Sequence, residues 1–103
     1  DHDKKFDDNM IRDLNSMLDT VQEAYDVMMS NLKEEHLTDI SNAVNAENRI
    51  NELRNALREK VAISLEGNDY NYLTGVYFMD IVTELEHIGD FIINISQAAY
   101  GSK

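Results

Sequence analysis

The stretch that decides the fold is IRDLNSMLDTVQEAYDVMMSNL, at residues 11–32. Its apolar residues recur at alternating steps of three and four, which places them along one side of a helix with 3.6 residues per turn. This spacing is sustained over three heptads and is typical of a long helix that packs against other helices. The members of the stripe are Ile11, Leu14, Leu18, Val21, Tyr25, Met28 and Leu32. Carboxylates at Asp7 and Asp8 suit the positive end of the helix dipole.

A second helical pattern follows a polar break at residues 34–39. Thr38 or Asp39 is a candidate N-cap for it, because both side chains accept hydrogen bonds from free backbone N–H groups. Gly67 is a natural stop at its end. One acidic residue interrupts the stripe, which consists of Ile40, Val44, Glu47, Ile50, Leu53, Leu57, Val61 and Leu65.

A third helical pattern follows Gly67-Asn68-Asp69, and Asp69 is its candidate N-cap. Its apolar face consists of Phe78, Ile81, Val82, Leu85, Ile88, Ile92, Ile95 and Ala99. The aromatic residues that open this helix favour packing at the end of a bundle over a ligand platform, and they are Tyr70, Tyr72, Tyr77 and Phe78. The five methionines are interpreted in the same way, as packing residues.

These patterns predict an all-α protein with helices at about residues 6–33, 38–66 and 70–99. The chain contains no proline, which agrees with three uninterrupted helices. Long amphipathic helices joined by short connections pack antiparallel to their neighbours in sequence. We therefore expect an up-down-up antiparallel three-helix bundle that forms a single domain over residues 1–103.

The charge of the chain restricts its partners. Nine Lys and Arg residues against 20 Asp and Glu residues give a net charge of −11. Nucleic acid and anionic lipid need a positive surface, so neither is an expected partner. No apolar run approaches the roughly 20 residues that span a bilayer, so we expect no membrane insertion by this segment. The chain begins at Asp1 and stops just after a helical pattern, which suggests a piece of a longer protein.

Two acidic positions interrupt the apolar faces. Glu47 lies within the second stripe with Asn51 one turn later, and Glu86 borders the third apolar face with Asp90 one turn later. Residues four positions apart project side by side from a helix, where two carboxylates repel each other unless a cation lies between them. Hard metal cations favour such oxygen ligands. The alternative is pairing with a nearby arginine, and Arg49, Arg54 and Arg58 are available.

An enzymatic role finds little support in the residues. Glu84 and His87 form one Glu-x-x-His step, the unit of carboxylate-bridged di-iron bundles, but those bundles need two such units and further glutamates. Both residues also fall on the polar side of the third helix. There is no cysteine and no phosphate-binding glycine-rich loop. We therefore expect no catalytic residues, and a metal enzyme is the least favoured of the alternatives.

The third helix also carries a resemblance to a known family. Its run Leu85-Glu86-His87-Ile88-Gly89-Asp90 resembles the signature of PhoU domains, which is of a Leu-Glu-Arg-Ile-Gly-Asp type. The preceding run, residues 70–77, looks like the PhoU-related domain that follows the membrane part of bacterial sodium/phosphate cotransporters. The stretch at residues 47–54 is similar to the other motif of the family. The resemblance covers residues 38–99, whereas the first helix matches only in pattern.

The resemblance implies two acidic motifs on two helices that bind clustered metal ions. Carried over, they are Glu86 with Asp90, and Glu47 with Asn51. Asn51 stands where the family has an aspartate, which weakens the second half of the site, and His87 stands where the signature has arginine. Divalent or ferric ions are the implied cofactors. One bundle is half of the duplicated family architecture, so a complete site needs a second copy.

The leading hypothesis from the resemblance is a regulatory domain of a bacterial sodium/phosphate cotransporter. Such a domain lies at the cytoplasmic face of the inner membrane, docks on the transmembrane domain of its parent protein and controls phosphate uptake. The alternative is a structural module that dimerises the parent protein through an apolar face, such as the stripe at residues 11–32, and forms a homo-oligomer.

Overall fold

A computed structural model of the chain describes residues 6–67 and 71–101. It contains three helices, α1 (Asp8–Leu32), α2 (Ser41–Glu66) and α3 (Tyr72–Gly101), and the described residues form no strand. The all-α prediction is confirmed, and each helix begins and ends within three residues of its expected bounds. Over the same residues, no helix combines the length and the apolar character that crossing a membrane requires.

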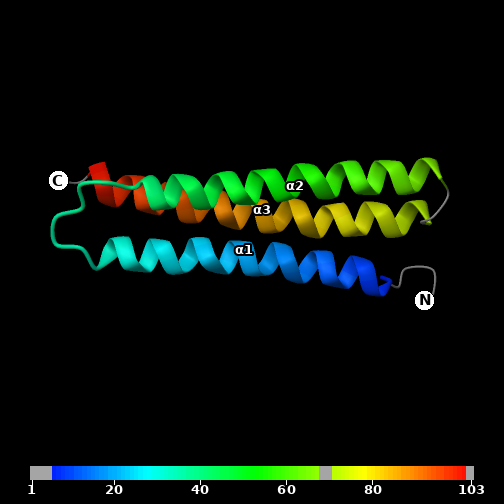
Figure 1. The fold of residues 1–103 in the computed structure, drawn as a ribbon, viewed down its shortest axis with the longest axis horizontal. Coiled ribbons are helices and arrows are strands. Elements are labelled where there is room, and N and C mark those ends of the chain that lie inside the picture. The colour runs from blue at the N-terminus through cyan, green and yellow to red at the C-terminus, as the bar shows by residue number, and fades with distance from the viewer. Residues whose placement is uncertain (1–5, 68–70, 102–103) are drawn as a thin grey trace.

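The three helices run in alternating directions (Figure 1). Lys60 of α2 pairs with Asp13 near the start of α1, and Arg49 pairs with Glu23 further along it, so these two helices are antiparallel. Between α2 and α3, Arg54 pairs with Glu86 while the earlier Ile50 lies against the later Gly89, so these two helices are antiparallel as well. All three helices pack pairwise in a rod of 52 × 22 × 17 Å.

Side chains just before each helix bond the free N–H groups of its first turn. Asp7 accepts a hydrogen bond of 2.8 Å from the N–H of Met10, and Asn71 accepts one of 2.9 Å from the N–H of Leu73. Asp39 accepts one of 2.7 Å from the N–H of Ser41, and this bond, with a contribution from the Ser41 hydroxyl, lowers the pKa of the Asp39 carboxyl. Because the pKa of Asp39 is lowered, this hydrogen bond stabilises the fold at neutral pH, and the stabilisation is lost when Asp39 is protonated on acidification.

The caps correct two details of the sequence prediction. The N-cap of α2 is Ile40, so neither Thr38 nor Asp39 is the N-cap as predicted, although Asp39 accepts the bond from the N–H of Ser41 from just outside the helix. Asp69 lies outside the described residues, and Asn71 occupies the capping role at α3. Gly67 follows the last residue of α2 with φ of −86°, so it ends the helix without using the left-handed region.

The centre of the bundle is lined by a different part of α1 than the stripe alone suggests. Met10, Met17 and Ala24 are fully buried, with Val21 and Met28 beside them. Four members of the stripe, at every seventh position, are instead exposed, and they are Ile11, Leu18, Tyr25 and Leu32. The orientation of α1 about its own axis explains the difference. α2 and α3 contact α1 along the row of Met10, Met17 and Ala24, so the exposed row lies at the edge of this contact.

In α2 and α3 the buried residues also differ from the predicted apolar faces, at fewer positions. Val44 of α2 is exposed, and the adjacent Ala43 and Ala46 are buried in its place. Ile81 and Ile88 of α3 are exposed as well, although Phe78, Val82, Leu85 and Ile92 of the predicted face are buried. Phe78 stacks edge-on against Phe6, with ring centroids 6.1 Å apart. The methionines at 10, 17 and 28 are packing residues, as predicted.

The backbone of α3 lies close to α2 where Gly89 meets Ile50. A Cβ atom added to Gly89 would lie 2.7 Å from Cδ1 of Ile50, inside van der Waals contact. Ile50 is 1% exposed, so its side chain has little room to move away. Gly89 lies in the middle of a regular helix, so its backbone conformation does not require glycine. The lack of room for a Cβ atom does.

We expect Gly89→Ala to destabilise the fold by about 1 kcal/mol, because overpacking outweighs the gain in helix propensity. Adding Ile50→Val removes Cδ1 and should recover part of that loss, so the two substitutions should be strongly non-additive. Urea unfolding of the four proteins of this cycle measures the coupling. Gly101→Ala is the matched control, since nothing lies within 4 Å of a Cβ there. Additive effects of the two substitutions would contradict the steric explanation.

Candidate functional site

The predicted residues Glu47, Asn51 and Glu86 border the seam between α2 and α3, and the exposed Asp90 lies one turn beyond Glu86. The pairing of Arg54 with Glu86 and the contact of Gly89 with Ile50 fix the register of the two helices. In that register, Glu47 and Asn51 lie on the side of α2 that faces α3, since they precede Arg54 by seven and three residues and so share its helix face. The structure thus brings the two predicted half-motifs to one seam.

Arg54 and Glu86 form the central interaction of this seam. Their side chains are 21% and 12% exposed, so the ion pair is largely removed from water. A carboxylate in such a place needs a positive partner, because desolvation penalises an unpaired charge. Glu86 therefore pairs with an arginine, which is the alternative to metal binding that the sequence left open. The arginine is Arg54, and not Arg49 or Arg58.

The remaining predicted ligands lie further along the same seam. Glu47 and Asn51 are half-buried, and Asp90 is exposed. The register places Glu47 roughly 4 Å along the helix axis from the level of Asp90, at 1.5 Å per residue. Within residues 6–67 and 71–101, however, no three His, Cys, Asp or Glu side chains gather closely enough to hold a metal ion. Metal binding by these four residues remains a prediction.

The Glu-x-x-His step of α3 faces water. Nδ1 of His87 lies 4.0 Å from Oε1 of Glu84, and their side chains are 62% and 77% exposed. Both residues point away from the bundle interior, where a di-iron site would need its ligands. The exposure of both side chains agrees with the prediction that they lie on the polar side of the third helix.

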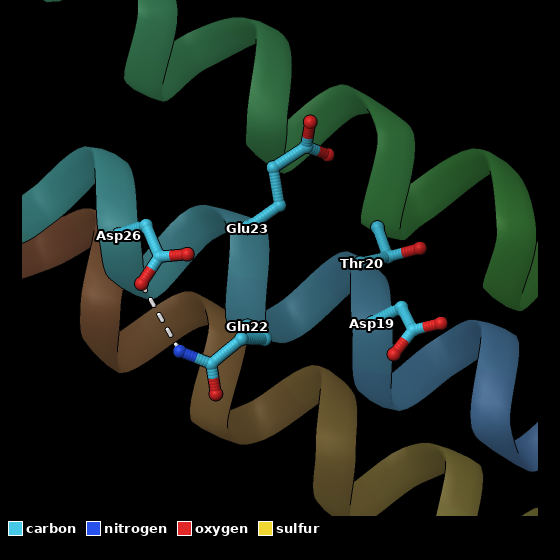
Figure 2. Close-up of a pocket in the computed structure, with 5 residues that line it drawn as sticks. All are labelled: Asp19, Thr20, Gln22, Glu23 and Asp26. Carbon is cyan, nitrogen blue, oxygen red and sulfur yellow. Dashed lines mark hydrogen bonds between the residues drawn. The ribbon is translucent and has the colours of Figure 1, made fainter.

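A second acidic surface lies on the outer side of α1 and was not singled out from the sequence. Figure 2 shows its shallow depression, in which Glu23 points toward α2 and Gln22 donates a hydrogen bond of 3.1 Å to Asp26. Arg49 of α2 donates to Glu23 at 3.0 Å. The depression is lined by Asp19, Thr20, Gln22, Glu23 and Asp26. The carboxylates at positions 19, 23 and 26 follow helical spacing, and this spacing could have identified the acidic surface from the sequence.

The fold and the site define a class of protein, an acidic three-helix bundle with a largely buried ion pair and two half-buried polar residues along one helix seam. The model of the PhoU domain family matches residues 14–99, and the chain therefore belongs to the PhoU domain family. The match includes most of α1, which resembled the family only in pattern. Neither a curated protein nor a solved structure gives a significant match.

We expect Arg54→Gln to lower the free energy of unfolding by about 1–3 kcal/mol, because it leaves Glu86 desolvated without its partner. Adding Glu86→Gln should restore part of this loss by removing the buried charge. Urea unfolding at neutral pH measures both changes.

Arg49→Gln provides the control, because Arg49 and Glu23 are both about half exposed. Exposed pairs of this kind contribute less than about 1 kcal/mol. Equal losses for Arg54→Gln and Arg49→Gln would contradict a special role for the seam.

Proposed function

We propose that this PhoU domain is a regulatory domain that controls phosphate uptake and carries no catalytic residues. The observation that supports this proposal is the family match across residues 14–99, which includes all of α2 and most of α1 and α3. A regulatory role is also compatible with the chemistry of the seam, where Arg54 neutralises Glu86. The regulation then depends on docking and on changes in helix packing.

The parent protein in this proposal is a bacterial sodium/phosphate cotransporter, and the domain lies at the cytoplasmic face of the inner membrane. The resemblance of residues 70–77 to the domain that follows the membrane part of such transporters supports this choice. None of the helices formed by the described residues is suited to crossing a bilayer, so the proposed contact with the transmembrane domain is made from outside the bilayer.

Metal binding at the seam is the second part of the proposal. Glu86, Asp90, Glu47 and Asn51 supply oxygen atoms, which suit hard cations. Arg54 already provides a positive charge at Glu86, so a metal ion competes with this arginine for the same carboxylate. Asn51 supplies a neutral carbonyl oxygen in place of a carboxylate, so the α2 half of the site attracts cations less strongly.

Deleting the domain from the proposed parent transporter should change phosphate uptake or its response to external phosphate. The physical reason is that docking on the transmembrane domain biases its conformational equilibrium only while the domain is present. Uptake of radiolabelled phosphate into cells at high and low phosphate measures the effect, with membrane levels of the transporter checked by immunoblot. Unchanged uptake under both conditions would contradict the regulatory proposal.

Elemental analysis of the chain purified without chelator tests the metal proposal. We expect a stoichiometric divalent or ferric ion in the parent chain and a trace amount in the double variant Glu86→Gln, Asp90→Asn, because the variant removes both α3 charges. Glu84→Gln is the matched control, since it removes an exposed carboxylate from the same helix. Trace metal in the parent chain and in every variant would restrict the function to docking.

A further inference from the structure

The exposed row of α1 lies on the side of that helix that faces α3. Asp13 and Glu23 mark the α2 side of α1, because they pair with Lys60 and Arg49. At 100° per residue, Leu18 lies about 140° around the helix axis from Asp13, and the arc from Leu18 to Glu23 in the opposite sense covers the outer face. The buried residues Met17 and Val21 lie between Leu18 and Asp13. The row that contains Leu18 therefore borders α3 on the outer side of the bundle.

An exposed row of α3 borders the same seam from the other side. Glu86 marks the α2 side of α3, because it pairs with Arg54. Ile88 lies about 160° around the axis from Glu86, and Ile81 lies on the same side as Ile88. The buried Val82, Leu85 and Ile92 fill the arc between these edges. Ile81 and Ile88 therefore face outward next to α1.

The two rows are also level with each other along the bundle. Phe6 stacks on Phe78, and α1 and α3 run in the same direction, as Figure 1 shows. This register places Ile11 with Ile81, and Leu18 with Ile88, each pair within about 3 Å along the axis. Together they form one continuous surface, the α1–α3 stripe, which consists of Ile11, Leu18, Tyr25, Leu32, Ile81 and Ile88.

The stripe is too apolar for an ordinary solvent-facing surface. Leu18 and Ile88 are each about half exposed, at 50% and 49%, and Phe91 just beyond Ile88 is 66% exposed. Single exposed apolar residues are common, but a contiguous row marks an interaction site. The row from Ile11 to Leu32 is about 30 Å long at 1.5 Å per residue, which is the length of a helix of about 20 residues.

The edges of the stripe carry predominantly negative charge. Asp19 and Asp26 lie on the outer side of α1 beside Leu18 and Tyr25, and Figure 2 shows their carboxylates in the shallow depression there. Asp80 and Glu84 lie on the corresponding outer side of α3, and both are exposed. Arg12 and Lys33 are the basic residues on the α1 edge, at the two ends of this stretch. A partner that carries positive charge on both sides of an apolar row complements this pattern.

We propose that the α1–α3 stripe is the docking site for a basic amphipathic helix of a partner segment, which completes a four-helix arrangement. The proposal rests on the docking function proposed above and names its surface and the chemistry of its partner. A groove between two parallel helices fits a third helix laid along it. A second copy of this chain is disfavoured as the occupant, because each copy carries a net charge of −11 and the same acidic edges.

The test uses the 103-residue chain and a helical peptide of about 20 residues, with leucine at heptad spacing on one face and lysine on both edges. A second peptide has the same leucines and glutamate in place of lysine. We expect the lysine peptide to bind and to weaken with added salt, and the glutamate peptide to bind at least about tenfold more weakly. Fluorescence anisotropy of labelled peptides measures both.

Variants of the stripe test whether the apolar row itself makes the contact. The double variant Leu18→Gln, Ile88→Gln should bind the lysine peptide at least about tenfold more weakly, since two apolar side chains are lost without any change in charge. Ile63→Gln is the matched control, because Ile63 is 61% exposed on α2 and lies away from the stripe. Circular dichroism melts confirm that each variant is folded. Equal binding by all variants would show charge attraction alone and overturn the proposal.

Three further outcomes bear on the occupant of the stripe and on the wider function. A concentration-dependent dimer in sedimentation equilibrium, abolished by the double variant, would assign the stripe to a second copy and overturn the basic-helix proposal. If domain deletion alters phosphate uptake but the lysine peptide does not bind, the stripe proposal fails and the regulatory proposal stands. If the peptide binds and deletion leaves uptake unchanged, the regulatory proposal fails alone.

Discussion

The contact between Gly89 and Ile50 is the constraint on which the arrangement of α2 and α3 depends. Only a residue without a Cβ atom allows the α3 backbone to lie against the buried side chain of Ile50. This approach fixes both the separation and the register of the helices, because the side chain of Ile50 fits at one level of α3 and not at the next. Glu86 is thereby held beside Arg54, one turn along the seam. The polar interaction follows from the steric one.

The ion pair of Arg54 and Glu86 shows how a strongly acidic chain tolerates a carboxylate at a helix seam. The chain has few basic residues, and three of them join helices, since Arg49, Arg54 and Lys60 all pair with acids on a neighbouring helix. Two of these pairs are exposed enough for water and salt to weaken them. The pair of Arg54 and Glu86 is less exposed, so its charges depend more strongly on each other. A metal ion bound by Glu86 would therefore replace an existing stabilising contact.

The sequence predicted the helices better than it predicted their rotation. Amphipathic spacing and the absence of proline are local properties, so the three helices could be located within a few residues. Which of two adjacent rows is buried depends on where neighbouring helices touch, and Leu18 and Met17 exchanged roles for that reason. The same limit applies to the site. Spacing identified Glu86 as a residue in need of a cation, but only the register of α2 against α3 could select Arg54 as its partner.

The two proposed surfaces are both built on α3, which has a consequence for regulation. Glu86 faces α2, whereas Ile81 and Ile88 border α1, so one helix carries the seam on one side and part of the α1–α3 stripe on the other. If cation binding at the seam displaces Arg54 and shifts α3, the geometry of the stripe changes with it. Thermodynamic linkage then requires that a docked helix change cation affinity by the same factor. The close contact at Gly89 holds the register of α2 against α3, so a rotation of α3, and not sliding, is the motion that could connect the two surfaces.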